Sequence, residues 1–112
     1  MDIGIVSMRY AKALMEYAKS TGTEDRLYTE MRTLSRSFEK HSDLRAALEN
    51  PVLPVQEKFS LICTAAVGDA PAGQELSRFV TLILKNRREA FLQYICLSDL
   101  DLDRKSRHIG VA

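Results

Sequence analysis

Three aspartates, Asp99, Asp101 and Asp103, alternate near the end of the chain, as the first calcium ligands of an EF-hand loop do. Such a loop also requires a glycine at its sixth position and a glutamate at its twelfth. Those positions hold Arg104 and Gly110 in this sequence, so the pattern does not predict a calcium site. We expect the three aspartates to lie on a solvated helix end or tail.

Other residues that could do chemistry are scattered. His41 and His108 are far apart, and neither has a second metal ligand three or four residues away. Ser7, Ser35 and Ser60 lack the glycine-flanked turn that exposes a nucleophilic serine. The chain also has no glycine-rich phosphate-binding loop. The sequence therefore predicts no catalytic residue, no metal site and no cofactor, and so a protein that is not an enzyme.

Composition and charge point to one globular domain. The 112 residues are 46% hydrophobic and 28% charged, with a net charge of +1, so there is no overall positive field to attract nucleic acid. A small helical DNA-binding or regulatory domain, using the basic segment 104–108, is the alternative hypothesis. Cys63 and Cys96 show no metal-binding spacing and are expected to be buried, reduced thiols. No apolar run is long enough to cross a membrane.

Apolar residues recur at helical spacing along almost the whole chain, whereas no segment alternates as a buried strand would. We predict an all-α, six-helix bundle, with Thr23 and Ser42 as N-caps and Gly22 as a left-handed C-cap. In the second helix, the face opposite the core should carry Arg26 and Glu30. The helices are expected over about 3–19, 23–40, 42–50, 54–67, 74–86 and 91–102.

The first of these helices, 3–19, has more apolar surface than one core contact requires. Such a helix is either fully buried, or it packs one face on its own domain and offers the other to a partner. The fifth helix, 74–86, carries one leucine, Leu82, away from its core stripe. The apolar residues of the first helix form two groups. One comprises Ile3, Val6, Tyr10, Ala13, Leu14 and Tyr17, and the other comprises Met8, Ala11, Met15 and Ala18.

Three motifs together resemble one family. Residues 8–14 (MRYAKAL) resemble an N-terminal R-Y-A-x-A-L/F motif, and residues 50–54 (NPVLP), followed by Lys58, resemble N-P-x-x-x-x-x-x-K. Residues 82–88 (LILKNRR) resemble an L-x-x-N-x-R ending of the fifth helix. The family is the delta subunit of bacterial F-type ATP synthase, which corresponds to the mitochondrial oligomycin-sensitivity-conferring protein.

The resemblance implies a stator, or peripheral-stalk, subunit without catalysis of its own. In that family the first and fifth helices of a six-helix N-terminal domain form a groove for the N-terminal helix of an alpha subunit. A second domain contacts the b-subunit stalk. The expected location is peripheral, at the cytoplasmic face of the bacterial inner membrane, with no direct membrane insertion and no nucleic-acid partner.

The resemblance covers the family's N-terminal domain. We expect a helical bundle over 1–107 and the start of a linker over 108–112, in a fragment that lacks the second domain. Two positions depart from the family pattern: Arg9 stands where proline is common, and Arg87 often corresponds to glycine.

The resemblance also implies which side chains meet the partner. Tyr10 and Ala13 match the family's binding motif by position, and the motif favours an outward face for both, with Met8 and Met15 in the core. Plain core packing of the same residues is the competing interpretation. Helical geometry adds further residues to the predicted groove, namely Leu14, Tyr17, Phe79, Leu82 and Ile83.

Overall fold

The computed structural model describes residues 3–68, 70 and 72–108, with side chains up to residue 105. Over these residues every regular element is helical, which confirms the predicted all-α bundle of six helices. The elements are α1 (Ile3–Thr21), α2 (Glu24–Lys40), α3 (Ser42–Glu49), α4 (Val55–Val67), α5 (Gln74–Lys85), the short 3-10 helix η1 (Glu89–Phe91) and α6 (Leu92–His108).

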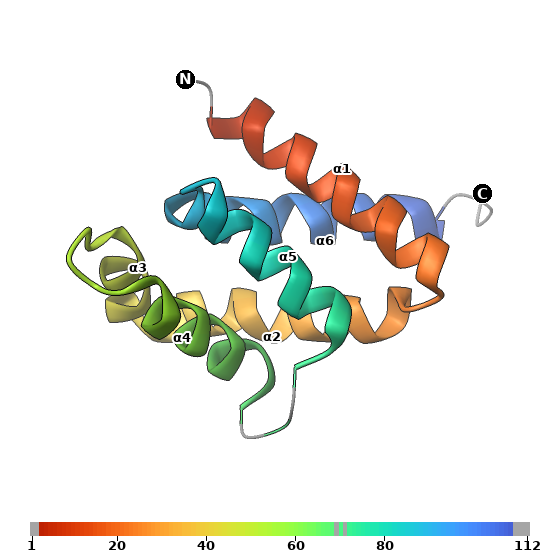
Figure 1. The fold of residues 1–112 in the computed structure, drawn as a ribbon. Coiled ribbons are helices and arrows are strands. Elements are labelled where there is room, and N and C mark those ends of the chain that lie inside the picture. Colours follow the sequence, from red (N-terminus) through yellow and green to blue (C-terminus); the bar gives the residue numbers. More distant parts are fainter. Residues whose placement is uncertain (1–2, 69, 71, 109–112) are drawn as a thin grey trace.

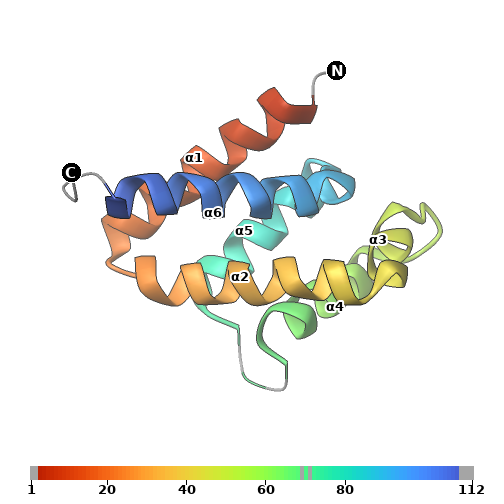
Figure 2. The ribbon, with the colours of Figure 1, turned by 180° about the vertical axis from the view of Figure 1, so that it is seen from behind.

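The helices are arranged around α2 and α6. Figure 1 shows α1 and α5 crossing one face of these two helices in roughly parallel lines, and Figure 2 shows α2 and α6 side by side on the opposite face. The most extensive contact joins α1 to α6, followed by α2 with α4 and α2 with α6. Contact between α1 and α5 is sparse. The two helices therefore share a face of the bundle without packing tightly on each other.

The core stripe predicted on α5 is confirmed, and α2 carries a buried stripe of the same kind. Each fully buried leucine or isoleucine contributes about 1.5–3 kcal/mol relative to an exposed one, so these stripes are a major source of stability. The buried stripe of α2 comprises Leu27, Met31, Leu34 and Phe38, and that of α5 comprises Leu76, Phe79, Val80, Ile83 and Leu84.

The inward face of α1 consists mostly of small side chains. Ser7, Ala11, Leu14 and Ala18 are all buried on this helix, whereas Ala13 is exposed. Small residues at a helix contact let the two backbones approach closely. The prediction that Met8 and Met15 lie in the core is only partly right, because both side chains remain partly exposed at the edge of the contact.

Gly22 terminates α1. Its φ is +71°, its amide donates to the Lys19 carbonyl at 3.4 Å, and the Thr23 amide donates to the Ala18 carbonyl at 3.0 Å. This pair of hydrogen bonds is the Schellman motif, which glycine favours because it has no Cβ. The predicted C-cap is confirmed.

Several predicted boundaries require correction. Thr23 precedes α2 but its hydroxyl makes no capping hydrogen bond, and His41 rather than Ser42 is the N-cap of α3. α6 continues to His108, past the expected end at 102. Of the predicted linker 108–112, His108 is the last residue of α6 and the other four lie outside the described residues.

Two expectations about charged surfaces are wrong. Glu30 is buried on α2, where its carboxylate accepts a hydrogen bond from the Gly73 amide at 3.1 Å. Asp99 and Asp103 are also buried, because α6 extends far enough to pack them near α1 and α2 around a cavity of about 10 Å³. Only Asp101 of the three aspartates is exposed, and it pairs with Lys105 at 3.1 Å.

Burial changes the acidity of Asp99. Loss of hydration, together with repulsion by the nearby Asp103 carboxylate, raises the pKa of Asp99 to about 7. Glu24 and Tyr28 of α2 line the same cavity. A carboxyl group whose pKa is raised on folding binds more protons in the folded state than in the unfolded state.

The end of α5 repeats the motif that ends α1, but with a non-glycine residue. The Arg87 amide donates to the Leu84 carbonyl at 3.1 Å, and the Arg88 amide donates to the Ile83 carbonyl at 2.9 Å. Arg87 has φ +55°, the only positive value at a non-glycine residue in the described chain. Arg87 thus occupies a conformation that glycine adopts with less strain.

Replacing Arg87 by glycine should raise the free energy of unfolding by about 1 kcal/mol, because the left-handed conformation then costs less. Urea denaturation of Arg87→Gly and wild type measures this difference. Arg88→Gly is the matched control, since Arg88 has φ −110° and gains nothing from glycine. A loss of stability in Arg87→Gly equal to that in Arg88→Gly would contradict the assignment of strain.

The stability of the domain should fall as the pH rises between about 4 and 7, because the raised pKa of Asp99 favours the folded state only while the carboxyl is protonated. Asp99→Asn should remove this dependence and be more stable than wild type at pH 7.5 by about 2–4 kcal/mol. Urea denaturation at pH 5.0 and 7.5 tests both points, with exposed Asp101→Asn as the control. Equal pH dependence in Asp99→Asn and wild type would refute it.

Candidate partner-binding groove

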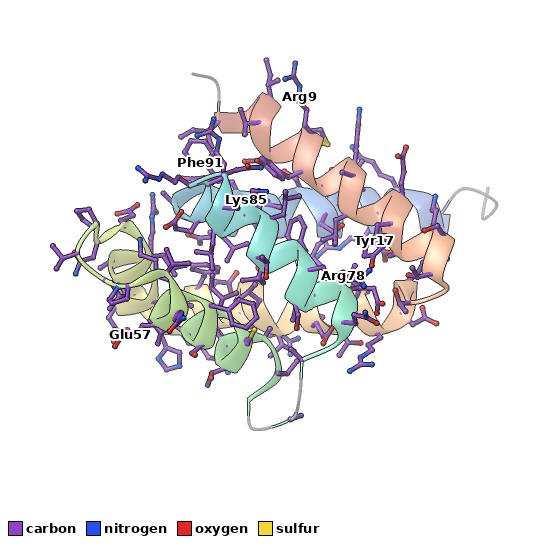
Figure 3. All side chains as sticks on the ribbon, viewed as in Figure 1. Arg9, Tyr17, Glu57, Arg78, Lys85 and Phe91 are labelled. Carbon is purple, nitrogen blue, oxygen red and sulfur yellow. The ribbon has the colours of Figure 1, made fainter. Side chains whose placement is uncertain are left out.

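A shallow hollow of about 190 Å³ lies between α1 and α5, and we call it the α1/α5 groove. It forms because the two helices share a face of the bundle but contact each other sparsely. Figure 3 shows two of its residues, Tyr17 of α1 and Arg78 of α5, on facing sides. The full lining is Tyr10, Ala13, Leu14 and Tyr17 from α1 and Arg78, Phe79 and Leu82 from α5.

Six of the seven residues predicted for the groove line it, and the seventh does not. Ile83 is 0% exposed and belongs to the core, because it points toward the middle of the bundle from α5. Leu14 and Phe79 are also largely buried and make the floor. Whether the six lining residues bind a partner stays a prediction.

The rim of the groove presents apolar surface to solvent. Leu82 is 44% exposed, although an apolar side chain of this size is usually buried on its own domain. Ala13 is exposed on the opposite side, and its small side chain leaves room for a partner backbone. The groove thus combines a buried apolar floor with an exposed apolar edge.

Two hydrogen bonds join the helices across the groove. The Asn86 side-chain amide donates to the Tyr10 hydroxyl at 2.9 Å, and the Arg78 guanidinium donates to the Tyr17 hydroxyl at 3.0 Å. The two tyrosine rings therefore lie along the groove with their polar ends satisfied. Sequence reasoning did not place Arg78 or Asn86 at the groove, although Arg78 stands one helical turn before Leu82 and Asn86 belongs to a recognised motif.

A second hollow lies on the other flank of α5, between α4 and α5. It measures about 670 Å³, and sequence reasoning did not anticipate it. Val55 is 57% exposed here because it starts α4 at the edge of the bundle. The lining residues are Val55, Gln56, Phe59, Ser60, Thr81, Leu84, Lys85 and Arg87.

Lys58, the lysine of the N-P-x-x-x-x-x-x-K motif, makes a buried ion pair. Lys58 is buried in α4, and its Nζ donates to the Glu89 carboxylate at 2.8 Å, with side-chain exposures of 7% and 11%. This ion pair joins the start of α4 to η1, just after α5 ends. The ion pair therefore connects α4 to the segment after α5, next to the second hollow, and neither residue lines the α1/α5 groove.

The described residues offer no group of three or more histidine, cysteine, aspartate or glutamate side chains that could hold a metal ion. Cys63 and Cys96 are unpaired, and burial raises the pKa of both thiols, although Cys63 is only partly buried. None of the helices in the described part of the chain is long and apolar enough to span a membrane.

The fold defines a small all-α bundle domain with an apolar groove between its first and fifth helices. The family model described as ATP synthase delta (OSCP) subunit matches residues 6–112. The chain belongs to this family, which confirms the resemblance seen in its motifs.

Curated relatives named ATP synthase subunit delta agree with this assignment. One from Bacteroides thetaiotaomicron is 56% identical over 99% of this chain and 60% of the relative. One from Parabacteroides distasonis is 41% identical over 97% and 59%, and one from Desulforudis audaxviator is 32% identical over 95% and 57%. The chain thus spans about three fifths of the length of these relatives. No solved structure matches it significantly.

Removing the charge of Lys58 should destabilise the domain strongly, because it leaves the Glu89 carboxylate buried and unpaired. Lys58→Met is expected to lower the free energy of unfolding by about 3–5 kcal/mol, whereas Lys58→Met/Glu89→Leu should recover most of the loss. Chemical denaturation of the two variants measures both effects. If the double variant is less stable than Lys58→Met, the ion pair is not the cause.

Proposed function

We propose that this chain is a non-catalytic part of the peripheral stalk, or stator, of the proton-translocating ATP synthase. Its α1/α5 groove binds the N-terminal amphipathic helix of an alpha subunit of the catalytic head. The observation that carries the proposal is the groove itself, where Tyr10, Ala13 and Tyr17 of α1 face Leu82 of α5 in a chain of the delta family.

Helix-in-groove recognition explains why this surface stays apolar. A partner helix inserts side chains at i, i+3, i+4 and i+7 into such a groove. The rings of Tyr10 and Tyr17 offer rigid contact area, and Ala13 permits close approach. Burying four or five large apolar side chains yields roughly 8–12 kcal/mol gross. After the costs of association and ordering, micromolar to nanomolar affinity is expected.

A stator must resist torque, and one contact of this affinity is modest for that task. A second attachment on the same protein strengthens the first through effective concentration. We infer that this attachment joins the b-subunit stalk through a C-terminal domain, which relatives of greater length have room to hold. The protein would then be peripheral, at the cytoplasmic face of the bacterial inner membrane.

Family membership favours this function over the alternative of a DNA-binding or regulatory domain. The net charge of +1 gives that alternative no support either, since non-specific DNA binding depends on several phosphate contacts from one basic surface.

A synthetic peptide of the alpha-subunit N-terminus from the same organism should bind at the groove, because its apolar face covers α1 and α5 there. In an NMR titration, resonances of α1 and α5 should shift or broaden. The variant Ala13→Asp should weaken binding by at least about tenfold while changing the thermal melt little, since Ala13 is exposed.

The matched control is Ala46→Asp, an exposed alanine of α3 that lines none of the hollows described above. It should bind the peptide as wild type does. Shifts confined to helices other than α1 and α5 would overturn the proposed site. A melt that collapses in Ala13→Asp would mean that this face belongs to the core.

A further inference from the structure

The outer face of α5 carries two cations, Arg78 at the edge of the α1/α5 groove and Lys85 at the edge of the second hollow. Arg78, Leu82 and Lys85 follow one another at four- and three-residue spacing, so they lie along one side of the helix, and all three are exposed. We call this row the α5 crest. Figure 3 shows Arg78 and Lys85 toward opposite ends of α5. The crest borders the groove, because Arg78 and Leu82 line it.

Neither crest cation is neutralised within the described part of the chain. The ion pairs there involve Arg26, Arg45, Lys58 and Lys105. Arg78 uses Nη1 to donate to the Tyr17 hydroxyl, which leaves its other donors facing solvent. The side-chain ammonium of Lys85 makes no hydrogen bond or ion pair with a described residue.

The bond to Tyr17 also orients Arg78. A guanidinium presents its donors in a planar fork, and holding one nitrogen fixes the plane in which the others lie. A side chain that is already ordered loses less entropy when it pairs with a partner. Arg78 is therefore suited to receive a carboxylate from a helix lying in the groove.

From these observations, and resting on the proposed function, we propose that the α5 crest selects a partner helix with carboxylates on the flank that faces α5. Arg78 and Lys85 are separated by seven residues, or about 10 Å along the helix axis. A partner helix running along α5 matches this separation with two acidic residues seven positions apart. Its apolar stripe then covers Leu82 and Ala13 while the two acids meet the two cations.

The effect should appear mainly as selectivity. Each exposed ion pair changes an affinity by about 1.5- to 5-fold, so two favourable pairs strengthen binding by about 2- to 25-fold. Replacing the acids by lysines adds repulsion, which widens the difference between right and wrong partners. Because the pairs are exposed, salt should reduce this difference.

The test uses two synthetic amphipathic peptides with the same leucine and isoleucine face. One carries glutamates seven positions apart on one flank, and the other carries lysines there. The wild-type chain should bind the glutamate peptide at least tenfold more tightly than the lysine peptide in 50 mM salt, measured by calorimetry, and the ratio should shrink in 0.5 M salt. Arg78→Glu/Lys85→Glu should reverse the preference.

Arg36→Glu/Lys40→Glu is the control, because it changes the net charge equally through exposed residues of α2 that line none of the hollows described above. It should keep the wild-type preference. Reversal in this control as well would assign the effect to net charge and overturn the proposal.

The alpha-subunit peptide is titrated in parallel to separate two failures. If it binds at α1 and α5 while the designed peptides bind with equal affinity, or not at all, the crest is not selective and the proposed function stands. If the alpha-subunit peptide does not bind, the proposed function itself fails.

Discussion

The packing of α1 on α6 is the contact on which the rest of the surface depends. Ala11 and Ala18 are buried small side chains of α1, a composition that lets helices approach closely, and Leu14 belongs to the shared core. Because this side of α1 is buried, the other apolar side chains of the helix, Tyr10, Ala13 and Tyr17, line the groove next to α5. A helix with two apolar faces therefore produces a stable bundle and an open groove at the same time.

Buried polar groups hold the connections between helices in place. Glu30 of α2 accepts a hydrogen bond from Gly73 at the start of α5, and Lys58 of α4 pairs with Glu89 just after α5 ends. Both ends of α5 are thereby tied to other parts of the bundle. Such pairs are costly to break because the remaining partner stays buried, so they fix where α5 lies relative to its neighbours.

The position of α5 matters because it separates two hollows. On one flank it meets α1 at the groove bridged by Tyr10 and Tyr17, and on the other it meets α4 at a larger hollow. The exposed row that contains Leu82 lies between them. An apolar edge flanked by cations on a rigid helix can distinguish partners by charge as well as by shape.

The sequence by itself determined the helices, their core stripes, the Gly22 cap and the family, because these depend on local periodicity, turn chemistry and short motifs. It also predicted six of the residues that line the groove, two from the family motif and four from helical spacing, which fixes the side chains that share a face. Tertiary structure decided the burial of Asp99 and Glu30, because burial depends on which helix covers each face. The bridge between Arg78 and Tyr17 joins residues far apart in the chain, so only the packing of α1 beside α5 could bring them together.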